Sequence, residues 1–129
     1  MNLDEMADRL ETAADRVGEV TEQRMRHVGR LGVARIRQNA SGRPGPNVIT
    51  GQYRASWRAE TRGIPHGAEC TIGTTKPQGR RLEFGFYNMV DSLGRRYFQP
   101  PFPHVQPALG YIEDSLHEQM EAVVEELLS

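Results

Sequence analysis

The stretch Thr50-Gly51-Gln52-Tyr53-Arg54-Ala55-Ser56-Trp57 lies between a long helical pattern and a series of short strand-like segments. Two further phrases follow it, Leu82-Glu83-Phe84-Gly85 and the proline run Pro100-Pro101-Phe102-Pro103-His104-Val105-Gln106-Pro107-Ala108-Leu109. Each phrase sets glycine or proline, which restrict or free the backbone, beside an aromatic or arginine side chain. None has the form of a catalytic signature. Together they indicate a chain that fits against other proteins.

Upstream of this stretch, apolar residues recur at spacings of three and four, which predicts an amphipathic helix from about residue 3 to about residue 38. They are Leu3, Met6, Leu10, Ala13, Val17 and Val20, then Met25, Val28, Gly32 and Ile36 on a slightly shifted stripe. A straight helix of this length spans about 50 Å and overhangs a domain of this size. Either it bends at Gly18, Gly29 or Gly32, or it packs on another subunit. An isolated coiled coil is the alternative, although Arg24 and His27 break the stripe.

The segments that follow predict a sheet. The glycines and prolines of Ser41-Gly42-Arg43-Pro44-Gly45-Pro46 end the helical segment 1–40 and begin a flexible loop, 41–50. Three strands are expected in the region 51–106: Tyr53–Glu60, Ala68–Gly73 and Arg81–Phe86. Turns are expected at Ile64-Pro65-His66-Gly67 and Asp91-Ser92-Leu93-Gly94. Cys70 and Ile72 share one strand face.

A second helix is predicted over 107–129, with Pro107 suited to its first turn. One stripe carries its apolar residues: Leu109, Ile112, Leu116, Met120, Val123 and Leu127. This stripe has to cover a sheet or another helix. The expected fold class is therefore α+β, with a long N-terminal helix and a C-terminal helix packed on a small antiparallel β-sheet, and with long mobile loops.

Length and composition are those of a globular chain. The 129 residues fit one domain, 1–129, with 37% apolar residues and 26% charged residues. No apolar run reaches the roughly 18 residues of a membrane span. The acidic, amphipathic N-terminus predicts no signal peptide. The single cysteine, Cys70, allows no intrachain disulfide, so we expect folding in a reducing cytoplasm.

Charge is unevenly distributed although the net charge is only -1. Residues 1–22 hold seven acids, residues 23–46 hold six arginines and no acid, and the last 23 residues hold six acids and no Lys or Arg. Complementary charged faces of this kind steer association between copies or partners. The alternative for the N-terminal half is that its charges complement the helix dipole, which does not explain the C-terminal acids.

The sequence gives little indication of a catalytic, metal-binding or cofactor-binding site. The four histidines occur in unrelated contexts, without zinc-ligand spacing. Cys70 is expected to be a small buried residue rather than a nucleophile, and no phosphate loop or serine-hydrolase motif is present. We therefore expect no enzyme, no metal and no cofactor. The main alternative is a small nucleic-acid-binding protein, because arginines and aromatics alternate through the middle of the chain; the net charge argues against it.

In this order, the three phrases resemble those of tailed-bacteriophage tail-completion and head–tail joining (neck, connector) proteins. The matching residues are Pro46, Thr50, Gly51, Arg54 and Ser56, then Glu83, Phe84 and Gly85, then Pro101, Phe102, Pro103, Pro107 and Ala108. Tyr53 and Phe86 depart from the family pattern, and the segment 87–97 is longer than in a minimal member, as an insertion would be.

The resemblance implies a virion structural protein at the head–tail interface, assembled in the host cytoplasm. It implies a homo-oligomeric ring, a hexamer by family, that joins or seals the tail to the portal–connector complex and lets DNA pass. The partners that it implies are portal or head-completion proteins and tail-terminator or tail-tube proteins, without a membrane. A non-viral scaffold or adaptor remains a further alternative.

Twelve residues are predicted to have structural or interface roles: Thr50, Gly51, Arg54, Ser56, Glu83, Phe84, Gly85, Arg95, Arg96, Pro101, Phe102 and Pro103. Gly51 permits a turn from loop to strand, and Glu83 is expected to pair across strands with Arg54 or Arg58. The prolines stiffen an extended segment that lays Phe102 over the core or a neighbour. The loop 41–50 and the segment 87–96 are expected to become ordered on docking.

Overall fold

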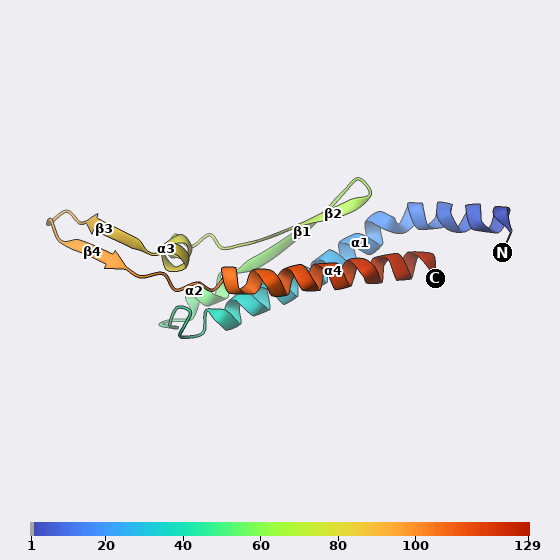
Figure 1. Cartoon of the computed structure of the whole chain (residues 1–129). Coiled ribbons are helices and arrows are strands. Elements are labelled where there is room, and N and C mark those ends of the chain that lie inside the picture. The colour runs from blue at the N-terminus through green and yellow to red at the C-terminus, as the bar shows by residue number, and fades with distance from the viewer. Residues whose placement is uncertain (1) are drawn as a thin grey trace.

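A computed structural model describes residues 2–129 of the chain, the side chains of residues 87–89 excepted. The elements follow in the order α1 (Leu3–Asn39), α2 (Gln52–Ala55), β1 (Arg58–Ile64), β2 (Gly67–Gly73), α3 (Gln78–Phe84), β3 (Phe86–Val90), β4 (Arg96–Gln99) and α4 (Gln106–Leu128). The molecule is elongated, with α1, α4 and the β1–β2 hairpin side by side (Figure 1). The β3–β4 hairpin projects at one end. The predicted α+β class is confirmed, but its strands form two separate antiparallel hairpins.

The long N-terminal helix is confirmed. Asn2 and Glu5 form a capping box at its start, where the Asn2 side chain accepts from the Glu5 N–H at 2.8 Å. The helix ends at Asn39, immediately before the predicted loop. Arg9 donates to the carbonyl of Leu128 at 3.4 Å, so the end of α4 is level with Arg9. The first turns of α1 extend beyond that point (Figure 1), as the length of the helix requires.

Two of the three glycines in α1 mark close contacts rather than bends. A Cβ on Gly29 would lie 2.8 Å from Cys70 Sγ, and one on Gly32 would lie 2.7 Å from Ile72 Cδ1. The helix can therefore approach the β1–β2 hairpin only because these positions lack side chains. The prediction that Cys70 and Ile72 share a face is confirmed, since both face α1.

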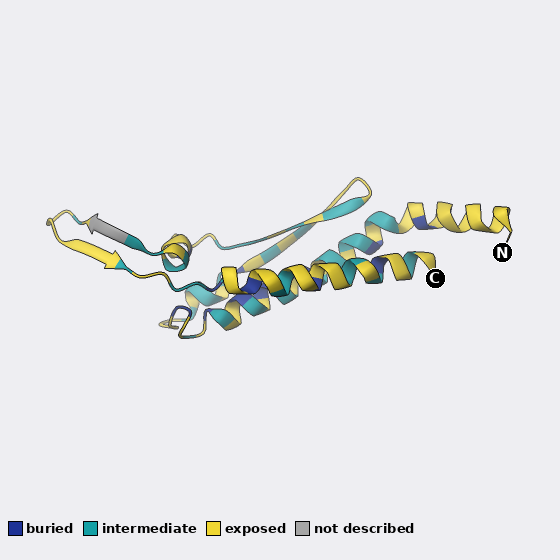
Figure 2. Cartoon of the chain, in the orientation of Figure 1, coloured by how far each residue is buried: buried dark blue, intermediate teal, exposed yellow. Residues whose placement is uncertain are grey.

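The core lies where α1, α2, β1 and α4 meet, and Figure 2 shows its buried residues gathered at that end of the helices. Its buried apolar members are Val33, Ile36, Trp57 and Ala108. Partly buried side chains complete the cluster: Tyr53, Ala59, Ile72, Val105 and Ile112. The protein thus draws its core from segments that are far apart in the sequence.

The predicted strand Tyr53–Glu60 is wrong over its first half. Gly51 adopts a left-handed conformation with φ of 81°, and one helical turn, α2, follows it. The last pair of the β1–β2 ladder joins Arg58 to Gly73, so the residues before Arg58 have no strand beside them. Backbone groups without a partner on a neighbouring strand form hydrogen bonds within their own segment. The Ala55 N–H, for example, donates to Gly51 O at 3.0 Å.

The predicted strand Arg81–Phe86 is also wrong, because residues Gln78–Phe84 form α3. Pro77 begins this helix, and the good helix formers Arg81, Leu82 and Glu83 continue it. Gly85, with φ of 72°, ends it. The predicted insertion 87–97 falls in the β3–β4 hairpin, whose turn at Asp91–Gly94 is confirmed by the bond from Gly94 N–H to Asp91 O at 3.1 Å.

The C-terminal helix is confirmed, with Pro107 in its first turn. Its predicted stripe is right at Val123, which is buried, and at Ile112, Met120 and Leu127, which are partly buried, but it is wrong at Leu109 and Leu116. Its buried residues are Ala108, Ser115 and Val123, whereas Leu109 is 54% exposed and Leu116 is 36% exposed. Toward the far end of the helix, Arg24 of α1 donates to Gln119 and to Glu126. No helix in residues 2–129 is long and apolar enough to cross a membrane.

Candidate assembly surfaces

Glu83 joins α3 to the start of α4. Its Oε2 accepts from the backbone N–H groups of His104 at 2.8 Å and Val105 at 3.0 Å, and its Oε1 accepts from that of Gln106 at 2.9 Å. These are N–H groups that a helix leaves without intrahelical partners at its start, where a negative charge is also favourable. The predicted pairing of Glu83 with Arg54 or Arg58 is therefore wrong, since the helix terminus takes that place.

His104 is completely buried beside this carboxylate. Its Nδ1 lies 2.9 Å from the Phe102 carbonyl oxygen and 3.1 Å from Glu83 Oε2, and its Nε2 lies 2.6 Å from Tyr53 Oη. A carbonyl oxygen can only accept, so Nδ1 carries the proton. In the neutral ring Nε2 then accepts from the Tyr53 hydroxyl. The prediction from sequence assigned His104 no role, although its place inside the proline run was a usable signal.

The contacts at this junction change the pKa of two side chains. Burial by itself raises the pKa of Glu83, but the three backbone donors and His104 outweigh it, so the pKa of Glu83 lies below its usual value. Burial, with the charge of Glu83, raises the pKa of the Tyr53 hydroxyl. Glu83 therefore stays ionised and Tyr53 stays protonated at neutral pH, as their hydrogen bonds require.

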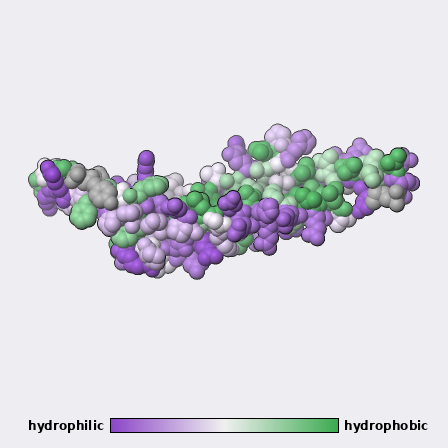
Figure 3. Space-filling view, viewed as in Figure 1, coloured by the Kyte–Doolittle hydropathy of each residue, from purple (hydrophilic) through white to green (hydrophobic). Residues whose placement is uncertain are grey.

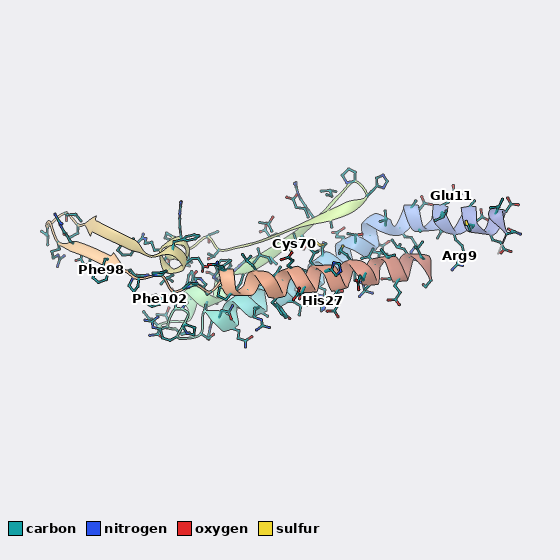
Figure 4. The ribbon with its side chains drawn as sticks, in the orientation of Figure 1. Arg9, Glu11, His27, Cys70, Phe98 and Phe102 are labelled. Carbon is teal, nitrogen blue, oxygen red and sulfur yellow. The ribbon has the colours of Figure 1, made fainter. Side chains whose placement is uncertain are left out.

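Phe102 is held from two sides at the same junction. Its N–H donates to Leu82 O at 2.6 Å, and the guanidinium of Arg43 lies over its ring, 3.7 Å from the centroid. Figure 4 shows Phe102 where the chain returns from the hairpin to the body. Since Arg43 comes from the loop 41–50, the loop has a contact with the third sequence phrase.

Gly85 fits where a larger residue does not. A Cβ there would lie 2.5 Å from Gln99 O and 2.9 Å from Pro101 N. The segment from Gln99 to Pro101 therefore crosses directly over the end of α3. The second and third phrases predicted from the sequence do meet in space, and they meet through backbone contacts.

The first phrase lies beside this junction and makes mostly local bonds. Thr50 Oγ1 accepts from the Gln52 N–H at 3.3 Å, and Arg54 donates to Ser41 Oγ at 3.0 Å. Ser56 bonds to the Tyr53 carbonyl and to Thr74 Oγ1. These residues thus fix the path of the chain from the loop into β1, and Tyr53 connects them to His104.

The remaining predicted residues lie elsewhere. Phe84 is 72% exposed on α3. Arg95 and Arg96 are on the projecting hairpin, where Arg95 Nε lies 2.7 Å from Asp91 Oδ2. Asp91 also accepts from the N–H groups of Leu93 and Arg95 and from the Tyr97 hydroxyl. The hairpin tip is therefore organised by its own hydrogen bonds.

Exposed apolar side chains gather on three surfaces. One is the overhanging start of α1, with Leu3, Met6 and Leu10; the second is the hairpin, with Val90, Leu93 and Phe98; the third is the outer side of α4, with Leu109, Leu116, Val124 and Leu128. Figure 3 shows apolar surface at the hairpin end and again along the helical part. Clusters of this kind mark contact sites between proteins.

Within the part of the chain that the structure describes, no group of three or more His, Cys, Asp and Glu side chains is placed to hold a metal ion. The buried His104 is hydrogen bonded on both nitrogens, and Glu83 is occupied by helix N–H groups. The arrangement therefore supports a structural role for this polar cluster.

Comparison with protein families gives one match. Residues 4–85 match the HK97-gp10-like family, described as "Bacteriophage HK97-gp10, putative tail-component". The comparisons with curated proteins and with solved structures gave no match. The matched region covers α1 to Gly85, which is more than half of the chain and includes the first two sequence phrases. The chain belongs to this family of phage tail components.

Proposed function

We propose that this HK97-gp10-like chain forms a ring, of six copies by family resemblance, at the head-proximal end of a long phage tail. The ring joins or seals the tail to the portal–connector complex, with DNA passing through its lumen. The observation that carries this proposal is the exposure of apolar side chains on an elongated chain, as at Leu3 (81%), Phe98 (72%) and Leu109 (54%). A subunit of a ring has two such unlike contact surfaces, one for each neighbour.

Charge supports contact with proteins more than contact with nucleic acid. Arg62 lies 2.6 Å from Glu69, Arg95 lies 2.7 Å from Asp91, and Arg24 lies 3.2 Å from Glu126. Part of the arginine charge is therefore neutralised within the chain. Nucleic-acid binding needs basic groups that are available to phosphates, so we place direct DNA binding second to assembly.

Deletion of the gene from its phage or prophage tests the proposed function. We expect DNA-filled heads and full-length tails that remain separate in electron micrographs, and joined particles when the gene is supplied on a plasmid. Antibody against an epitope added to the chain should label the head-proximal end of complete tails. Label along the tube or at the distal tip, or joined particles in the deletion, would contradict the proposal.

A further inference from the structure

One face of the projecting hairpin combines apolar and basic side chains. Arg96 and Phe98 are two apart on β4, and Val90 is the ladder partner of Arg96, so the three side chains share a face. Val90 is 58% exposed and Phe98 is 72% exposed. Among the described side chains, none forms an ion pair with Arg96. We call Val90, Arg96 and Phe98 the hairpin face.

The β3–β4 hairpin projects away from the helices and the β1–β2 hairpin. β3 and β4 extend from the junction in the direction opposite to α4 (Figure 1), and Figure 4 shows Phe98 on this extension. The bonds that Asp91 makes to Leu93, Arg95 and Tyr97 hold the tip in shape without help from the body. The hairpin face is therefore already shaped in the single chain. The α4 of the same chain cannot cover it.

The outer side of α4 has the complementary character. Leu109, Leu116 and Val124 are exposed, and their spacings of seven and eight residues align them along one side of the helix. An acidic depression follows the same helix, lined by Glu113, Asp114, His117, Glu118 and Glu121. Glu113 lies between Leu109 and Leu116 on the helix surface, four residues after one and three before the other. We call Leu109, Glu113, Leu116 and Val124 the α4 stripe.

We propose that the hairpin face of one copy docks on the α4 stripe of a second copy of this chain. Val90 and Phe98 cover Leu109 and Leu116, while Arg96 faces Glu113 and the acidic depression. Both surfaces are exposed among the described side chains, complementary in charge and alike in apolar content. A contact between two unlike patches is head-to-tail, and it closes into a ring when the rotation allows. The inference thus rests on the proposed ring and names its interface.

Two variants of the full chain test this pairing. In the first, Phe98→Asp with Arg96→Glu removes the hairpin face; in the second, Leu109→Lys with Glu113→Arg removes the α4 stripe. Each variant alone should be monomeric by mass photometry, while the wild type forms the closed oligomer. An equimolar mixture should stop at a dimer, because each variant retains the one surface that the other lacks. Circular dichroism establishes that both variants are folded.

A matched control changes residues that belong to neither of the two proposed surfaces. Phe84→Asp with Arg80→Glu makes the same chemical change on α3, and it should leave the oligomer unchanged. A disulfide test is independent of charge: in a Cys70→Ala chain that carries Phe98→Cys and Leu116→Cys, oxidation should give a ladder of covalent multimers. The ladder should end at the number of copies in the ring.

Each outcome decides the pairing. The pairing would be overturned if either double variant assembled like the wild type or if the mixture remained monomeric. It would also be overturned if the wild type never self-associated or if oxidation gave no ladder. The proposed function is judged separately, by the position of the chain in the particle. A chain that seals the tail end but gives no ladder would refute this interface alone, whereas a ladder from a chain absent from tails would refute the function alone.

Discussion

Glu83 caps the helix that begins beside His104: its Oε2 accepts from the His104 backbone N–H at 2.8 Å and lies 3.1 Å from Nδ1 of the same residue. One carboxylate thereby fixes the N-terminus of α4 and orients a fully buried imidazole, which in turn accepts from Tyr53 Oη at 2.6 Å. The cluster connects α2, α3 and α4, the elements that surround the base of the projecting hairpin. A rigid base is what a hairpin needs if it is to present a contact face.

Removal of this carboxylate should destabilise the chain. Glu83→Ala leaves three helix N–H groups without their acceptor, and we expect a loss of about 2–3 kcal/mol in the free energy of unfolding. Glu83→Gln keeps one acceptor oxygen and should lose less. Urea unfolding followed by circular dichroism measures both. Glu118→Gln, on the exposed side of α4, is the control and should change stability little; an equal loss in both would refute the capping role.

Acid should weaken the same cluster. The pKa of Glu83 is lower in the folded chain than its usual value, so its stabilising contribution is present above the unfolded pKa and is lost as pH falls through the folded pKa. The unfolding free energies of the wild type and Glu83→Gln should therefore converge as pH is lowered from 7 into the acid range. Urea titrations at stepped pH measure the gap. A gap that stays constant down to pH 3 would contradict this account of the site.

The glycines of α1 should divide into two classes. Gly29→Ala places a methyl group 2.8 Å from Cys70 Sγ and 2.9 Å from Ala59 Cβ, and overpacking of this kind costs about 1–3 kcal/mol. A methyl group on Gly18 would meet no atom within 4 Å, so Gly18→Ala should instead gain up to about 1 kcal/mol through helix propensity. Thermal and urea unfolding of the two variants should move in opposite directions.

Two glycines with similar positive φ angles give a second pair. Gly85 and Gly94 have φ of 72° and 78°. A Cβ on Gly85 meets Gln99 O at 2.5 Å, whereas one on Gly94 meets nothing within 4 Å. Gly94→Ala should cost only the strain of a left-handed residue, about 1–2 kcal/mol, and Gly85→Ala should cost clearly more. Equal losses in urea unfolding would mean that the chain crossing over Gly85 can move aside.

The sequence predicted α1, α4 and the β1–β2 hairpin because periodicity, glycine and proline report on local structure. It failed at residues 53–57 and 81–84, where the absence of a neighbouring strand decides between a strand and a helical turn. That neighbour is set by the register of β1 on β2, which ends at Arg58 and Gly73. The role of His104 also lies beyond local patterns, since its partners Tyr53 and Glu83 are 51 and 21 residues away.

The exposure of Leu116 on α4 gives the last prediction, because a stripe read from the sequence alone treats Leu116 and Val123 as equally buried. Val123 is 6% exposed and Leu116 is 36% exposed. Val123→Asp places a charge in an apolar contact without a partner and should unfold the chain. Leu116→Asp should leave the monomer folded, at a cost of about 1 kcal/mol, but should prevent its self-association. Circular dichroism and mass photometry of the two variants separate folding from assembly, and an unfolded Leu116→Asp chain would place that side chain in the core after all.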